Sequence, residues 1–167
     1  TWNIGYAELE DDTRAHTKDL PAVAEVITKA NPDAVALQEL TGKEQLNVLL
    51  RLLQGRYRGD VAQQGQNDRF EAVLVKETEA SFTPVRIGSL YALAASFKPH
   101  ADGPQVVVVS AHAHAFNAAR RRRYTEGLMD WAKSHMQSSE VFIAGDFNFE
   151  LSAVNETNLY TDNVKHD

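Results

Sequence analysis

The chain has 167 residues, of which 43% are hydrophobic and 24% charged, a composition typical of a globular protein with its own core. It carries 17 basic and 23 acidic residues, and its net charge of −6 argues against a broad basic surface for nucleic acid. The absence of cysteine excludes disulfides, zinc–thiolate sites, iron–sulfur clusters and cysteine nucleophiles. No apolar run approaches the roughly 20 residues that cross a bilayer. We expect a soluble protein, either cytoplasmic or secreted after removal of a signal peptide.

The first part of the chain predicts strands and helices in alternation. The patterns cover, in chain order, residues 1–4 (strand), 20–27 (helix), 34–37 (strand) and 46–53 (helix). The run 34–37 is apolar without alternation, which is typical of a strand covered on both faces. Thr41 and Glu44 have the spacing of a capping box and predict the start of the second helix.

From about residue 57 the pattern changes to short strands separated by turn-rich segments. The expected strands are Tyr57–Val61, Phe70–Val75, Leu90–Phe97 and Val106–Ala111, followed by a helix over about 117–136 and a strand at Val141–Ala144. This order predicts a mixed α/β domain in which helices pack on sheets. No repeat, low-complexity tract or composition break divides the chain, so we expect residues 1–167 to belong to one domain.

Polar residues follow the first two predicted strands. Asn3 ends the first, and Glu39 ends the second, about one strand–helix–strand unit later. Because strands joined by a crossover helix run parallel, their carboxyl ends lie at one edge of the sheet. An amide oxygen and a carboxylate there would suit Mg²⁺. On these two residues alone, a turn at Asn3 and a solvated Glu39 remain the simpler alternative.

Two later strands also end in residues suited to phosphate chemistry. One apolar strand leads into His112, and another leads into Gly145, Asp146, Phe147 and Asn148. Asp146 and Asn148 are two residues apart, so in extended backbone their side chains face the same side. Gly145 permits close approach of backbone or ligand. A carboxylate and an amide on one side could orient a water and donate to a phosphate oxygen.

Taken in order, these motifs resemble the endonuclease/exonuclease/phosphatase superfamily, the deoxyribonuclease I-like group of metal-dependent phosphoesterases. The matching segments are Thr1–Ile4, Asp33–Glu39, the strand into His112 and Gly145–Asn148, and the resemblance runs to about Glu150. The strand-borne histidine is similar to the deoxyribonuclease, sphingomyelinase and cytolethal-distending-toxin branch. The resemblance implies an α/β fold of the α+β type, a two-layer β-sandwich flanked by helices.

The resemblance also implies a role for each motif residue. Glu39 would bind Mg²⁺, with Mn²⁺ as an alternative ion, and Asn3 would lie in or next to the ligand shell. His112 would hydrogen-bond the scissile phosphate or assist departure of the leaving group. Asp146 would position the attacking water or its base, and Asn148 would stabilise the phosphate in the transition state.

Other positions match less closely. Asn67 and Glu71 loosely resemble the family's substrate-side residues. The deoxyribonuclease branch's phosphate-clamping arginine has no clear counterpart, Arg86 being the nearest basic residue. The family ends in a Ser-Asp-His segment that supplies the general base, whereas here His166-Asp167 stands in reversed order. We therefore expect the C-terminal strands and the base to lie beyond these residues, and residues 1–167 alone to show weak stability and little activity.

The predicted function is that of a Mg²⁺-dependent phosphoesterase in which water attacks a phosphate ester. Nucleic acid, a phospholipid head group and a small phosphate ester remain open as substrates, as does the oligomeric state. The alternative is a non-catalytic phosphate- or metal-binding module on the same scaffold. His114 is a weaker alternative to His112. The run Arg120–Arg123 spreads around a helix, and this favours a solvated helix start over a phosphate site.

Overall fold

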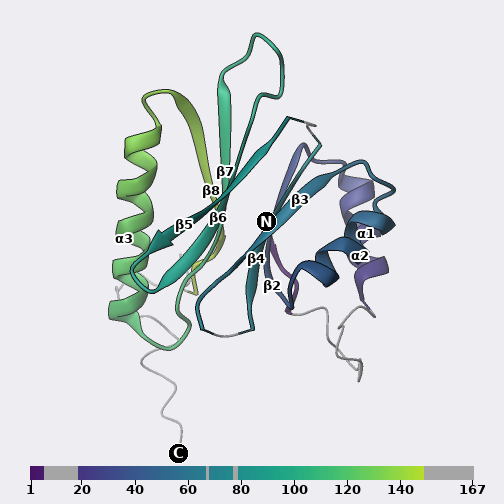
Figure 1. The fold of residues 1–167 in the computed structure, drawn as a ribbon. Helices are drawn as coiled ribbons and strands as arrows, with labels where there is room; N and C mark the ends of the chain where they lie inside the picture. Colours follow the sequence, from purple (N-terminus) through teal and green to yellow (C-terminus); the bar gives the residue numbers. More distant parts are fainter. Residues whose placement is uncertain (6–18, 67, 77–78, 149–167) are drawn as a thin grey trace, which may run out of the picture.

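The computed structural model describes residues 1–5, 19–66, 68–76 and 79–148. Two four-stranded sheets pack against each other, and helices cover their outer faces, as Figure 1 shows. The expected two-layer β-sandwich flanked by helices is therefore confirmed. Within the described residues, no helix has the length and apolarity that a membrane crossing requires.

The first sheet is built from the N-terminal half of the chain. Its strand order is β1 (Trp2–Asn3), β2 (Ala34–Leu40), β4 (Phe70–Val75) and β3 (Arg58–Gln63). Strands β1 and β2 pair in parallel, and the other pairs are antiparallel. Helices α1 (Leu20–Ala30) and α2 (Lys43–Leu52) pack on its outer face through the apolar stripes that the sequence predicts.

The second sheet is built from the following strands in simple order, namely β5 (Ser81–Ile87), β6 (Leu90–Phe97), β7 (Gln105–His112) and β8 (Ser139–Asp146). Helix α3 (Ala118–His135) joins β7 to β8 and covers the outer face of this sheet. Because α3 is a crossover connection, β7 and β8 run parallel, and His112 is the register partner of Asp146.

The interior consists of three apolar layers. One lies between α1, α2 and the first sheet, and one lies between α3 and the second sheet. The third lies between the two sheets and contains Ala62, Val73, Val75, Leu93, Ala95 and Phe97. Strand β4 contributes to both faces of the first sheet, because Val73 and Val75 face the other sheet while Ala72 and Leu74 face the helices.

Two local expectations are wrong. No strand was expected between the predicted strands 70–75 and 90–97. The structure has β5 there, an edge strand in which Pro84 is tolerated because a residue without an N–H can lie at a sheet edge. The capping box is also absent. Helix α2 begins after Gly42 without a side-chain cap, and Oε1 of Gln45, rather than of Glu44, accepts from the Thr41 backbone N–H at 3.0 Å.

Candidate active site

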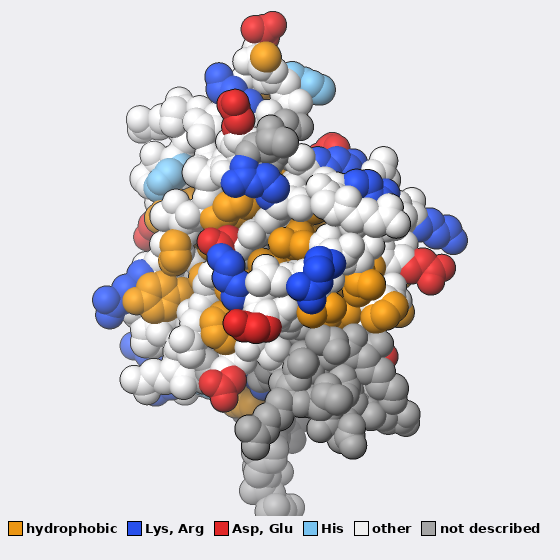
Figure 2. All heavy atoms as spheres, turned by 45° about the vertical axis from the view of Figure 1, so that its right-hand side comes forward, with side chains coloured by type: hydrophobic (Ala, Val, Ile, Leu, Met, Phe, Trp, Pro, Cys, Tyr) orange, Lys and Arg blue, Asp and Glu red, His pale blue; other side chains and the backbone are white. Residues whose placement is uncertain are grey.

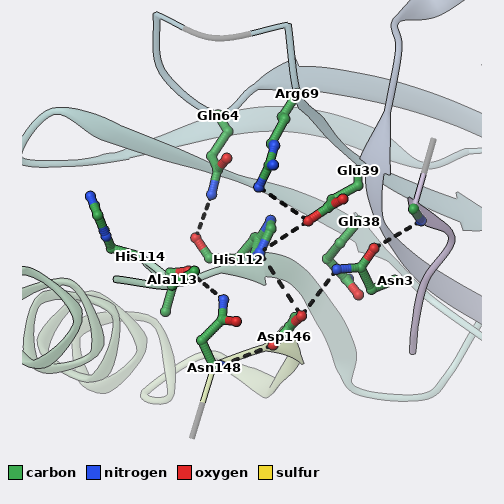
Figure 3. Close-up of polar contacts among 12 residues, drawn as sticks. Asn3, Gln38, Glu39, Gln64, Arg69, His112, Ala113, His114, Asp146 and Asn148 are labelled. Carbon is green, nitrogen blue, oxygen red and sulfur yellow. Dashed lines mark hydrogen bonds and ion pairs between the residues drawn. The ribbon is translucent and has the colours of Figure 1, made fainter. Parts of the chain in front are cut away.

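The carboxyl ends of β1, β2, β7 and β8 meet at one edge where the two sheets face each other. Each strand delivers one polar side chain there: Asn3 from β1, Glu39 from β2, His112 from β7 and Asp146 from β8 (Figure 3). Asn148 follows two residues after the end of β8. The structure thus brings together the five strand-end residues that the sequence singled out.

Glu39 reaches this cluster through an irregularity in its strand. The register of β2 against β4 shifts between Leu37 and Leu40, and Glu39 has a φ of 61°, an uncommon backbone conformation for a residue that is not glycine. Its carboxylate oxygen Oε1 lies 3.2 Å from Nη1 of Arg69 and 3.6 Å from Nε2 of His112. The bulge turns the carboxylate of Glu39 toward the second sheet.

His112 lies at the centre of the cluster with a side chain that is only 2% exposed. Its Nε2 faces two carboxylates, at 3.6 Å from Glu39 and 3.9 Å from Asp146, while Nδ1 lies 3.7 Å from Oε1 of Glu71. The backbone carbonyl of His112 accepts from the side-chain amide of Gln64 at 2.8 Å. Burial lowers the pKa of the imidazole, although Glu39 and Asp146 oppose this shift. The ring is therefore neutral near pH 7, and its two carboxylate neighbours favour a proton on Nε2.

Glu71 is a buried acid behind the histidine. Its side chain has no exposed surface, and within the described residues neither of its carboxyl oxygens has a hydrogen-bond partner. Burial raises the pKa of Glu71 well above its usual range, and the nearby Glu39 and Asp146 raise it further. Glu71 was expected to face the substrate; in the structure it lies against Nδ1 of His112, where it can orient the ring.

Asp146 is held by hydrogen bonds on both carboxylate oxygens. Nδ2 of Asn3 donates to Oδ2 at 3.0 Å, and the backbone N–H of Asn148 donates to Oδ1 at 2.9 Å. The side chain of Asp146 remains 32% exposed, so solvent reaches it. Oδ1 of Asn3 accepts from the backbone N–H of Gly5 at 2.9 Å. These contacts fix the direction of a carboxylate that still faces solvent.

Asn148 does not follow the extended geometry expected from the sequence. Strand β8 ends at Asp146, and Asn148 has a φ of 54°, a left-handed conformation that asparagine tolerates. Its Nδ2 donates to the backbone carbonyl of Ala113 at 2.8 Å. This contact ties the end of β8 to the end of β7. Gly145 is required for close strand packing, because a Cβ at this position would overlap the backbone carbonyl of Ala111.

A cleft opens beside the cluster on the side of β1 and β8. Its volume is about 510 Å³, and its lining includes Asn3, Gln38, Asp146 and Asn148. Glu39 and His112 are not among the residues that line this cleft, and the side chain of His112 is buried. A substrate in the cleft would therefore meet Asn3 and Asp146 first.

The donor chemistry at this edge fits a magnesium-like ion with a hydrated shell. Among the described residues, no group of three or more histidine or acidic side chains is arranged to hold a metal by itself. Glu39 offers a carboxylate and Asn3 an amide oxygen, both hard donors. Mg²⁺ keeps several waters and binds through one or two carboxylates plus substrate phosphate, so a sparse protein shell suits it.

Two further residues, Arg69 and Gln38, contribute to the site without having been predicted from the sequence. Arg69 lies two residues before Glu71, a spacing that could have placed both on one side of a strand. Gln38 is fully buried beside Glu39, and its Nε2 donates to Oγ of Ser110 at 2.8 Å, which links β2 to β7. Nothing in the sequence alone pairs Gln38 with Ser110, because the contact joins the two sheets.

The sequence also singled out Asn67, the two C-terminal residues, His114 and the arginine run at 120–123. Asn67, His166 and Asp167 lie outside the described residues. His114 lies beyond the end of β7, and in Figure 3 its ring points away from Glu39 and Asp146. The arginine run is not simply a solvated helix start: Arg121 is buried, and its Nη1 donates to the carbonyls of His114 and Ala115 at 2.8 and 2.9 Å.

The sequence profile of the Endonuclease/Exonuclease/phosphatase family matches residues 1–157. The chain belongs to this family. No curated protein matches the chain by sequence. The strand-end motifs at Asn3, Glu39, His112 and Asp146 therefore lie within the family region.

Solved structures share the fold at low sequence identity. Truncated Caenorhabditis elegans TDP2 has a TM-score of 0.69 and 21% identity over 97% of this chain and 65% of its own. D. rerio TDP2 complexed with single-strand DNA product has a TM-score of 0.68 and 17% identity, over 89% and 59%. The human nocturnin catalytic domain with bound sulfate has 0.68 and 19%, over 90% and 63%. The chain thus spans less than two thirds of the length of these proteins.

Proposed function

We propose that this chain carries the core of a Mg²⁺- or Mn²⁺-dependent phosphoesterase that hydrolyses a phosphodiester. The observation that carries the proposal is the position of His112, whose Nε2 lies within 3.6 Å of Glu39 and 3.9 Å of Asp146 at the edge that Asn3 also reaches. Family membership supports the reaction class. A neighbour of the same fold is named as holding a single-strand DNA product, which supports a nuclease-like substrate over a phospholipid head group.

Each residue has a distinct task in this proposal. Glu39 and Asn3 would hold the ion, which when bound polarises the phosphate and stabilises the leaving oxygen. His112 would donate from Nε2 to a phosphate oxygen or the leaving group, with Glu71 orienting its ring from Nδ1. Asp146, held by Asn3 and by the Asn148 backbone, would accept a hydrogen bond from the attacking water and align it.

Glu39→Gln tests the proposal because it keeps the shape of the side chain and removes the charge that would hold the ion. Turnover of bis(p-nitrophenyl) phosphate with saturating Mg²⁺ should fall at least about 100-fold relative to the natural protein, since a metal supplies several kcal/mol of transition-state stabilisation. The thermal midpoint should change little. Glu25→Gln, on the exposed face of α1, is the matched control and should keep full activity.

Turnover by Glu39→Gln and by the natural protein distinguishes a metal-dependent phosphoesterase from a non-catalytic binding module. Unchanged turnover in Glu39→Gln would contradict the role given to Glu39. If the natural protein binds Mg²⁺ and phosphate but hydrolyses no ester, it is a non-catalytic binding module.

A further inference from the structure

Arg69 brings a permanent positive charge to a site built mainly from acids. Its Nη1 lies 3.2 Å from Oε1 of Glu39, the same oxygen that lies 3.6 Å from Nε2 of His112. Figure 3 shows the guanidinium extending from the segment between β3 and β4 across to Glu39. Asp146 adds a second carboxylate, whose Oδ2 lies 3.9 Å from Nε2 of His112. Arg69 thus offsets part of a concentrated negative charge.

The same carboxylate oxygen cannot serve the guanidinium and a divalent ion equally well. Both use the lone pairs of Glu39, and a cation beside Arg69 would be repelled by it. A metal ion bound at Glu39 therefore favours movement of the guanidinium away from Oε1. This argument rests on the proposed function, because it takes Glu39 as the metal ligand.

The backbone of Arg69 is hydrogen-bonded in place, whereas its side chain is partly exposed. The backbone carbonyl of Arg69 accepts from the N–H of Gln64 at 2.9 Å, which closes the segment between β3 and β4. Its side chain is 34% exposed, whereas that of Glu39 is 15% exposed. A guanidinium displaced from a carboxylate finds an equivalent partner in a phosphate, since both present two oxygens to its planar N–H groups.

We propose that Arg69 exchanges Glu39 for the phosphate of the substrate when a metal ion binds. Without metal, Arg69 neutralises Glu39 and holds it in place. With metal, the guanidinium is released and contacts a non-bridging phosphate oxygen. Metal and phosphodiester then bind cooperatively, and each tightens the other by the same factor.

The test measures binding rather than turnover. Mn²⁺ is titrated into the protein, with free Mn²⁺ followed by electron paramagnetic resonance, in the presence and absence of dimethyl phosphate, a diester that resists hydrolysis. The proteins are the natural chain, Arg69→Met, Glu39→Gln and Arg58→Met. Arg58 is the matched control, because it lies at the far end of β3, opposite Val75, while Glu39 lies near the end of β2 that pairs with Phe70.

Arg69→Met should bind Mn²⁺ alone about two- to fivefold more tightly than the natural chain, the range expected for loss of one partly exposed ion pair. In the natural chain, dimethyl phosphate should tighten Mn²⁺ binding by about fivefold or more. This enhancement should fall at least about threefold in Arg69→Met, because the released guanidinium is its main source. Arg58→Met should behave like the natural chain in both measurements.

Other results overturn the inference in distinguishable ways. If Glu39→Gln abolishes Mn²⁺ binding but Arg69→Met binds as the natural chain does, or more weakly, the proposed function stands and the exchange does not. Tighter Mn²⁺ binding with an undiminished dimethyl phosphate effect also overturns the exchange. Absence of Mn²⁺ binding to both the natural chain and Arg69→Met overturns both proposals.

Discussion

The imidazole of His112 shows how single residues are tuned by burial at this site. It is neutral because burial lowers its pKa, and it is oriented because acids lie on both sides of the ring. Burial also acts on Glu71, where it raises the pKa of the carboxyl group well above its usual range. A carboxyl group that is fully buried without a hydrogen-bond partner among the described residues is most stable when protonated.

Glu71→Gln should therefore stabilise the protein at high pH. The pKa of Glu71 is raised in the folded state. Ionisation of Glu71 therefore does not lower the free energy of unfolding at pH values below the pKa of the unfolded chain. It lowers that free energy as the pH rises from the unfolded-state pKa through the folded-state pKa. Glutamine does not titrate. Urea unfolding should give similar free energies for the two proteins at pH 4 and a higher free energy of unfolding for Glu71→Gln at pH 8. Exposed Glu25→Gln should show no such trend, and equal stabilities of Glu71→Gln and the natural protein at pH 8 would contradict the buried-charge account.

Neighbouring arginines in helix α3 make different contacts, one on the exposed side of the helix and one in the interior. Four consecutive arginines begin near its N-terminus, where positive charge opposes the helix dipole. Arg122 pairs with Glu126 at 2.8 Å on the exposed side, whereas Arg121 turns inward and binds the carbonyls of the segment that leads from β7. The buried guanidinium therefore holds the start of α3 against the end of the strand that carries His112.

Arg121→Ala should lower the free energy of unfolding by about 2–3 kcal/mol, because it leaves the carbonyls of His114 and Ala115 without their charged donor. Arg123→Ala, on the exposed side of the same helix, should change it by less than about 0.5 kcal/mol. Chemical denaturation of both variants provides the comparison. Similar small effects would show that the buried contact adds nothing to stability.

At the scale of the whole molecule, the site exists because two sheets meet. Glu39 comes from one sheet, and His112 and Asp146 come from the other. The buried bond between Gln38 and Ser110 crosses between them, and Oγ of Ser110 donates in turn to the Leu37 carbonyl at 2.9 Å. On the face shown in Figure 2, basic and acidic side chains are interspersed rather than gathered by sign.

Ser110→Ala should lower the free energy of unfolding by about 1–3 kcal/mol, because it leaves the buried amide of Gln38 without an acceptor. It should also lower phosphodiester turnover, since the sheets no longer share a fixed register at the site. Ser81→Ala, on the exposed edge strand β5, is the control and should affect neither quantity. Full stability and turnover in Ser110→Ala would show that apolar packing alone positions the sheets.

Much of the architecture followed from local patterns in the sequence. Apolar spacing predicted α1 and α2, and uninterrupted apolar runs predicted the buried strands β2 and β7. Strand β5 was missed because an edge strand needs no apolar alternation and tolerates proline. Asn148 was placed wrongly because the strand ends two residues earlier, which depends on where pairing with β7 stops.

The sequence by itself determined which strand ends bring polar residues to one edge, because parallel strands joined by a crossover helix end at the same edge of a sheet. Only the tertiary structure decided how these residues interact. The burial of Glu71 behind His112, the reach of Arg69 to Glu39 and the bond from Gln38 to Ser110 all join segments that are far apart in the chain. Such contacts depend on strand register within the first sheet and on the distance between the two packed sheets, and no local pattern of residues encodes these.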